Sequence, residues 1–290
     1  MKTKVLNFGS LNMDHVYQVQ HFVSPGETLS STKLQHFCGG KGLNQSIALA
    51  RAGANVYHAG AIGMDGLQLK KQLEEDGADT SFLQIREELE TGHAIIQVDE
   101  TGQNCIILYG GANQSITGMQ VDETLNLFEK GDIILLQNEI NELKYIMEKA
   151  YQKGLRIFLN PSPCDEKIME LPLELVDTLL LNEVEGEQIT GKKEKVLEAL
   201  KDKFPEMHII LTLGSKGSVY ADKENCVFCE AKKVNAVDTT AAGDTFTGYY
   251  IAAVSEGKSV KAALELATKA AAVAVTRQGA VPSIPYRKQL

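Results

Sequence analysis

A short run of small residues with one carboxylate stands out near the end of the chain, at residues 237–246 (VDTTAAGDTF). Ala241, Ala242 and Gly243 lead directly into an apolar helical pattern, so the first backbone N–H groups of that helix would be open to a ligand. These groups and the helix dipole favour an anion such as a phosphate. Asp244 would stand beside that anion, where it could accept a proton from an attacking hydroxyl. On its own, the same carboxylate could equally be a helix cap.

A second glycine-rich segment, GGKGLNQS at residues 39–46, also precedes a helical pattern. Its glycines permit positive φ and close approach of a ligand, although many strand–helix connections share this composition. Lys41 and Asn44 could form hydrogen bonds with hydroxyl groups. Asn12 and Asp14 follow the first apolar strand and, being two residues apart, would point to the same side of an extended chain. This spacing suits two neighbouring hydroxyls of a sugar, or a capped turn.

Two further polar segments follow apolar strands. Asn182 and Glu185 come after the strand expected at residues 178–181 and offer the oxygen ligands that a hydrated Mg²⁺ ion prefers. The glycine turn at residues 211–217 (LTLGSKG) would line a nucleotide site, or would only lead into a hairpin.

Other sites are not supported by the motifs. GKS at residues 257–259 has the ending of a P-loop, but Ala252 stands where that pattern requires glycine. No G-x-G-x-x-G follows a strand, so NAD binding is unsupported. Cys226 and Cys229 form a lone C-x-x-C without a second ligand pair, which favours a hairpin strand over a zinc site.

Composition narrows the class of protein further. The 290 residues carry a net charge of −9 and no basic run, which argues against a nucleic-acid partner. The odd number of cysteines, five, argues against a disulfide framework. We expect a cytoplasmic protein, because neither a signal peptide nor a membrane span is visible.

The elements that would position these residues alternate along the chain. Apolar strands are expected at residues 5–8, 55–61, 133–137, 156–160, 178–181 and 208–213. Helices are expected at residues 42–52, 67–76, 121–130, 142–153, 193–204, 243–255 and 260–276. This alternation predicts an α/β fold in one domain over residues 1–290, a three-layer sandwich around a parallel sheet. Two segments outside the alternation, about 15–38 and 91–110, are expected to form a small β-sheet lid over one end.

Together these segments resemble the PfkB-type carbohydrate kinases over nearly the whole chain. The matching segments are GSLNMDH (9–15), PGET (25–28), GGKGLNQS (39–46), GAN (111–113), NPSP (160–163), NEVEGEQITG (182–191), LTLGSKG (211–217), VDTTAAGDTFTG (237–248) and AVTRQGAVPSIP (274–285). The glycine-rich helix start combined with AAGD is a specific pair. Tyr249 departs from the family pattern, which prefers a small residue after Gly248, and the chain stops soon after Pro285 without the final helix of many relatives.

The resemblance implies a role for each matching residue. The sugar contacts would be Asn12, Asp14, Gly40, Lys41, Asn44 and Glu139. The base would be Asp244, and the anion hole Ala241, Ala242 and Gly243. Asn182 and Glu185 would belong to the segment that binds Mg²⁺ and phosphate. The ATP site would be lined by Thr212, Gly214, Ser215, Gly217 and Thr268. A monovalent cation, usually K⁺, would be held by the loops with Asp238, Thr240, Ala274, Arg277, Gly279 and Ser283.

The activity implied is transfer of the γ-phosphoryl group of ATP to the primary 5-hydroxyl of D-ribose, giving ribose 5-phosphate and ADP, in a homodimer paired through the lids. Deoxyribose, fructose or a nucleoside are alternative substrates. The lid aromatics Tyr17, Phe22, Phe37 and Tyr109 would suit the base of a nucleoside. A non-catalytic sugar-binding protein on the same fold is a further alternative, but it should lack the base or the anion hole.

Overall fold

Within residues 2–290, which the computed structural model describes, nine strands form one sheet in the order β13-β12-β11-β10-β9-β8-β1-β4-β5. From β5 to β11 in this order, neighbouring strands run parallel. Their bounds are β1 (Lys4–Phe8), β4 (Asn55–Gly63), β5 (Asp79–Arg86), β8 (Ile133–Gln137), β9 (Arg156–Asn160), β10 (Thr178–Asn182) and β11 (His208–Thr212). The antiparallel pair β12 (Gly217–Ala221) and β13 (Cys226–Glu230) extends one edge, and both cysteines of the C-x-x-C lie in β13.

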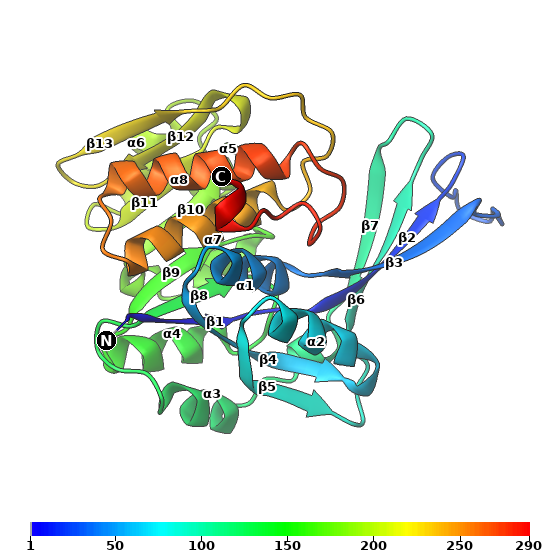
Figure 1. The fold of residues 1–290 in the computed structure, drawn as a ribbon, viewed down its shortest axis with the longest axis horizontal. Helices are drawn as coiled ribbons and strands as arrows, with labels where there is room; N and C mark the ends of the chain where they lie inside the picture. The colour runs from blue at the N-terminus through cyan, green and yellow to red at the C-terminus, as the bar shows by residue number, and fades with distance from the viewer. Residues whose placement is uncertain (1) are drawn as a thin grey trace.

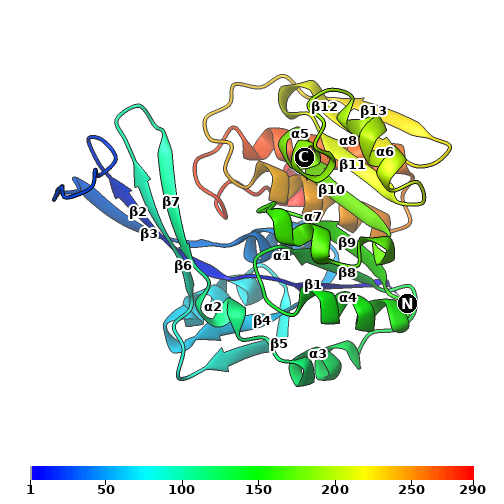
Figure 2. The ribbon, with the colours of Figure 1, turned by 180° about the vertical axis from the view of Figure 1, so that it is seen from behind.

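Helices cover both faces of this sheet, as the predicted three-layer architecture requires (Figures 1 and 2). One face carries α1 (Lys41–Arg51), α2 (Leu67–Glu75), α7 (Ala242–Ser255) and α8 (Val260–Ala274). The other carries α3 (Gly118–Leu125), α4 (Leu143–Gln152), α5 (Glu183–Thr190) and α6 (Val196–Lys203). Because both faces are covered, every residue of β8 is buried.

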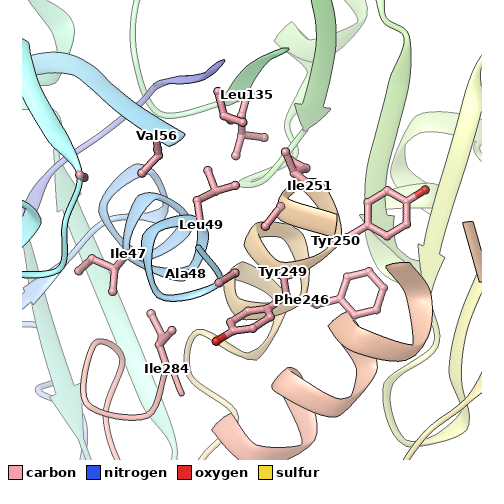
Figure 3. Packing of buried hydrophobic residues seen from close by; sticks show 14 of the residues in the cluster. Ile47, Ala48, Leu49, Val56, Leu135, Phe246, Tyr249, Tyr250, Ile251 and Ile284 are labelled. Carbon is pink, nitrogen blue, oxygen red and sulfur yellow. The ribbon is translucent and has the colours of Figure 1, made fainter. Parts of the chain in front are cut away.

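The helices α1 and α7 pack together in the first of these layers (Figure 3). A Cβ atom at Gly248 would overlap with the Cβ atom of Ala48, so glycine permits this close approach. Tyr249, where a small residue was expected, is fully buried and its hydroxyl donates to the carbonyl of Pro285 at 2.7 Å. The local packing therefore accommodates this departure by tying α7 to the last segment of the chain.

A second sheet has the order β3-β2-β6-β7 and projects from the main body (Figures 1 and 2). It consists of β2 (Asn12–Gln18), β3 (Lys33–Gly39), β6 (Gly92–Val98) and β7 (Asn104–Tyr109). The chain passes directly from the carboxyl end of β1 into β2, and from β3 through Gly40 into α1. The sheet is thus attached at the carboxyl edge of the main sheet.

Three elements differ most from the sequence expectation. The edge strand β5 was not expected, because its exposed and buried residues are mixed rather than continuously apolar. The helix α5 follows directly from β10, at residues for which the sequence suggested ion ligands and no helix. The helix expected at residues 121–130 begins earlier, since the Thr117 side chain accepts the Gln120 N–H, and it ends at Leu125.

Short 3-10 segments lie between these elements, namely η1 (Met64–Gly66), η2 (Gly111–Gln114), η3 (Glu166–Glu170), η4 (Leu173–Leu175) and η5 (Gly214–Lys216), and η6 (Arg287–Gln289) follows α8. No helix within residues 2–290 combines the length and the apolar character needed to cross a membrane.

Candidate active site

Polar residues gather where the parallel strands end. Gln137, Asn160, Asn182 and Thr212 are the last residues of four neighbouring strands, β8 to β11. In open α/β sheets, ligands bind beyond this carboxyl edge. A cavity of about 250 Å³ lies there, lined by Lys41, Asn160, Ser162, Leu180, Leu181, Asn182, Glu185, Thr212, Thr239, Ala241, Gly243, Asp244, Phe246 and Thr247.

Asp244 lies in the first turn of α7 and is only 8% exposed. Its Oδ2 accepts a hydrogen bond from Asn44 Nδ2 at 3.0 Å, and its Oδ1 accepts one from Gln45 Nε2 at 2.9 Å. Both donors come from α1, so the packing of α1 on α7 fixes the carboxylate. The side chain lines the cavity, where it can act on a bound hydroxyl.

The backbone around Asp244 opens toward the same cavity. Ala241 has a positive φ of 57°, which turns the chain into α7. Among residues 2–290, the N–H groups of Ala241 and Gly243 have no hydrogen-bond acceptor, whereas the N–H of Ala242 donates to Thr239 O at 3.2 Å. Two of the three amides expected in the anion hole are therefore open to an anion in this conformation.

The residues predicted to contact a sugar are brought together around the N-terminus of α1. Glu139, in the turn after β8, accepts hydrogen bonds from the Lys41 N–H at 3.0 Å and from Ser10 Oγ. Asn12 is buried, and its Oδ1 accepts a hydrogen bond from Asn113 Nδ2 at 2.8 Å. Gly40, with a φ of 95°, begins α1 beside the backbone of Asn12.

Asp14 differs from Asp244, because it accepts no hydrogen bond from the described residues. A Cβ atom at Gly39 would overlap with the carboxyl group of Asp14, so this position of β3 requires a residue without a side chain. Burial, with a further contribution from Glu139, raises the pKa of Asp14 to about 7. Burial likewise raises the pKa of Glu139, against the hydrogen bonds from Ser10 and Lys41.

Lys41 is the cation among these carboxyl groups. Burial alone would lower its pKa, but Asp244, Glu139 and Glu185 together raise the pKa above its ordinary value. Lys41 therefore stays protonated at neutral pH in the cavity that Asp244 and Glu185 also line.

A second cavity, of about 470 Å³, adjoins the first and shares Thr212, Thr239, Gly243 and Phe246 with it. The five residues predicted to line an ATP site, Thr212, Gly214, Ser215, Gly217 and Thr268, all line this cavity. Its remaining walls include apolar residues of the loop that follows β13, apolar residues of α8 and the residue that caps α8, namely Ala231, Val234, Ala236, Ala271, Ala272 and Val275. The second cavity, which is mainly apolar, and the first, which is mainly polar, thus meet at the start of α7.

Asn182 and Glu185 occupy the wall of the first cavity and also cap α5. Asn182 Oδ1 accepts the Glu185 N–H at 2.9 Å, while Glu185 Oε2 accepts the Asn182 N–H at 3.0 Å. The described residues contain no cluster of three acidic, histidine or cysteine side chains placed for a metal ion. One carboxylate of this kind fits an ion that is held mainly by phosphate oxygens and water.

The two loops predicted to hold a monovalent cation lie side by side. Asp238 Oδ2 accepts the Gly279 N–H at 2.8 Å, and its Oδ1 accepts from the N–H and the hydroxyl of Thr240. Burial opposes ionisation, but these hydrogen bonds hold the pKa of Asp238 below its usual value. Ala274 ends α8, Ser283 is fully buried, and the guanidinium of Arg277 donates to Gln289 Oε1 at 3.4 Å rather than toward Asp238.

Sequence reasoning missed the buried amide side chains that support the site. Gln45 donates to both Asp244 and Asn160, and Gln137 donates to Gln45. Asn113 joins Asn12 to the turn that follows β7. Gln45, Asn113 and Asn160 all lie within segments that the family pattern matches, which is the signal that could have found them.

The chain is similar to known proteins over nearly its whole length. The family model described as pfkB family carbohydrate kinase matches residues 2–287. A ribokinase from Haemophilus influenzae is 36% identical over 300 residues, covering 100% of this chain and 97% of the relative.

Two solved structures share the fold at a TM-score of 0.88. One is a ribokinase from Cryptococcus neoformans in complex with ADP, 33% identical, covering 99% of this chain and 100% of the other. The other is an Arabidopsis thaliana ribokinase complexed with ribose and ATP, 30% identical, covering 99% and 97%. This chain therefore belongs to the pfkB family of carbohydrate kinases.

Proposed function

We propose that this chain is an ATP-dependent ribokinase, which phosphorylates the 5-hydroxyl of D-ribose and releases ADP. The observation that carries the proposal is the position of Asp244, a buried carboxylate held at the start of α7 where the two cavities meet. Full-length similarity to ribokinases, including one solved with ribose and ATP, supports the choice of sugar.

The sugar would lie between the small sheet and α1. Asp14, without a hydrogen-bond donor among the described residues, would accept from sugar hydroxyls. Asn44 Oδ1 is buried without a partner among those residues, so a hydroxyl of the sugar would satisfy it. Its Nδ2 remains on Asp244, which places the acceptor hydroxyl next to the base.

In the reaction, the Asp244 carboxylate accepts the proton of the primary hydroxyl as its oxygen bonds to the γ-phosphorus. The bond from that phosphorus to the bridging oxygen breaks, and ADP leaves with that oxygen. The open N–H groups of Ala241 and Gly243, with the ammonium of Lys41, would stabilise the charge on the phosphoryl oxygens.

We further propose that Mg²⁺ accompanies ATP and that K⁺ supports the anion hole. Glu185 and Asn182 would hold the hydrated Mg²⁺ beside the phosphates, and when bound it would neutralise phosphate charge. The ionised Asp238, with Thr240 and the loop that contains Ala274, Arg277, Gly279 and Ser283, would hold the K⁺. The backbone of Val237 and Asp238 is tied to the carbonyl of Val275, so this loop adjoins the start of α7.

The small sheet would act as the lid, and a homodimer would form through it. The exposed apolar side chains of Phe37, Ile106 and Leu108 support this proposal, because they are costly to leave in water. Use of ATP also suits the expected cytoplasmic location.

The test is ADP release by the purified protein with ATP, Mg²⁺ and K⁺, using ribose, deoxyribose, fructose and a nucleoside as acceptors. We expect kcat/KM to be highest for ribose, and phosphorus NMR of the product to show a phosphate ester at the 5-position. A higher kcat/KM for another acceptor would reassign the substrate, and no acceptor-dependent ADP release would overturn the kinase proposal. Omitting K⁺ or Mg²⁺ in turn tests each ion.

A further inference from the structure

Gln45 lies behind the site, on the second turn of α1, and is fully buried. The two hydrogens of its Nε2 are both used: one points to Asp244 Oδ1 and the other to Asn160 Oδ1, each at 2.9 Å. Its Oε1 accepts a hydrogen bond from Gln137 Nε2 at 2.7 Å. No other side chain within residues 2–290 connects Asp244 to the strands of the main sheet by hydrogen bonds.

The surroundings allow one orientation of the Gln45 amide. Rotating it by 180° would bring its carbonyl oxygen against the Asp244 carboxylate and would face its NH₂ with the NH₂ of Gln137. Gln137 is itself anchored, because its Nε2 also donates to Asn7 Oδ1 at 2.9 Å. Asn7 in turn donates to Gly42 O and Ser46 Oγ, both at 2.8 Å. The chain of amides is therefore directional, and it ends on the carboxylate.

We infer that Gln45 is a positioning residue for phosphoryl transfer: it holds the Asp244 carboxylate in the rotation that faces the acceptor hydroxyl. Asn44 holds Oδ2 and Gln45 holds Oδ1, so the plane of the carboxylate is set by two donors on one helix. A base that must meet a proton within hydrogen-bond reach loses rate when its orientation is free. This inference rests on the proposed kinase function, since it concerns the same base.

The decisive variant is Gln45→Glu, which keeps the shape of the side chain and removes both N–H donors. Its carboxyl group would face Asp244 Oδ1 and Asn160 Oδ1, and two such carboxyls share one proton at neutral pH. Asp244 would then carry that proton for part of the time and fail as a base. We expect kcat at pH 7 to fall ~10–100-fold, with KM for ribose and ATP changed less than ~3-fold.

The pH profile distinguishes positioning from a merely structural role. In Gln45→Glu, the acidic limb of the kcat profile should move to higher pH by about one unit or more, because the shared proton must leave first. The other charged groups of the site are Asp14 on β2, Lys41 on α1, Glu139 after β8 and Glu185 on α5, and all four are unchanged in the variant. Any displacement of the limb therefore comes from position 45.

The matched control is Gln72→Glu on α2. Gln72 Nε2 donates to Asp76 Oδ2 at 2.9 Å, so this variant makes the same change beside another buried carboxylate, and neither residue lines either cavity. It should lose stability but keep the wild-type kcat and pH profile. Gln45→Met removes the hydrogen bonds without adding a charge. It should lower kcat even though no second carboxyl group faces Asp244. This variant takes the place of Gln45→Glu if the Glu variant does not fold.

The outcomes separate the two proposals. A wild-type protein that phosphorylates no sugar overturns the proposed function and, with it, this inference. An active wild type whose Gln45 variants keep its kcat and its pH profile overturns the inference alone. Equal losses of kcat in the Gln45 and Gln72 variants would likewise show that Gln45 has only a structural role.

Discussion

Two carboxylates of the proposed active site come from different parts of the molecule, and their hydrogen bonding differs. Asp244, at the start of α7, has a donor on each oxygen before any ligand arrives. Asp14, on the projecting sheet, has none among the described residues, and its pKa is raised to about 7. A group that carries out chemistry benefits from being held in advance, whereas a group that binds can wait for the ligand to supply its hydrogen bonds.

The comparison predicts the largest effect for Asp244. In Asp244→Asn, the amide keeps the size of the side chain but accepts no proton, so kcat should fall by ~10²–10⁴-fold. Ribose and ATP should still bind, which calorimetry can measure. Full turnover in this variant would show that Asp244 is not the base.

Asp14→Asn should affect binding rather than turnover. An amide keeps one acceptor oxygen but loses the charge-assisted hydrogen bonds to the sugar, each of which contributes about 1.5–3 kcal/mol. We expect Kd for ribose to rise ~10–100-fold, with kcat at saturating ribose within ~5-fold of wild type. A loss confined to kcat would reverse the roles assigned to the two carboxylates.

The pH dependence of sugar binding sharpens the contrast. Because the pKa of Asp14 is about 7, its carboxylate is mostly protonated at pH 6 and mostly ionised at pH 8. If the ionised form binds, the Kd for ribose should fall by roughly tenfold between these pH values, measured without ATP. In Asp14→Asn, the same measurement should give a flat profile.

The smallest effect concerns the stability of the unliganded protein. The pKa of Asp14 lies near 7 in the folded chain and near 3.8 when exposed, so the folded state binds the extra proton between these values. Stability contributed by this group therefore decreases as pH rises through that window and reaches its minimum above pH 7.

Relative to wild type, Asp14→Asn should gain about 1 kcal/mol of unfolding free energy when the pH is raised from 6 to 8. Urea denaturation at both pH values measures this difference. If the difference in unfolding free energy between Asp14→Asn and wild type is the same at pH 6 and pH 8, titration of Asp14 is excluded as its cause.

Much of this arrangement could be predicted from the sequence, because its signals are local. The apolar strands from β8 to β11 are buried on both faces, which makes them continuous in sequence and easy to recognise. The residues at the start of α7 are adjacent in sequence, so Asp244 and the backbone N–H groups before it could be predicted together. The segments that lack a helical pattern do form the second sheet.

What could not be predicted depends on contacts between distant segments. Gln45 and Asp244 are 199 residues apart, and an amide in an apolar helix gives no sign of which carboxylate it meets. The raised pKa of Asp14 follows from burial beside Glu139, which only the folded chain brings near. The capping pair of Asn182 and Glu185 shows the opposite difficulty, since residues suited to an ion also begin a helix.

The short crossings between the two sheets have a consequence for how such a protein can change over time. Within residues 2–290, only residues 9–11, 40, 87–91 and 110 link the strands of the small sheet to the main body along the chain. Substitutions in β2, β3, β6 and β7 can therefore alter the proposed sugar contacts of this sheet, Asn12 and Asp14, while the start of α7 stays unchanged. Part of a new acceptor preference could then arise by changes in one projecting sheet, without changes in the main sheet.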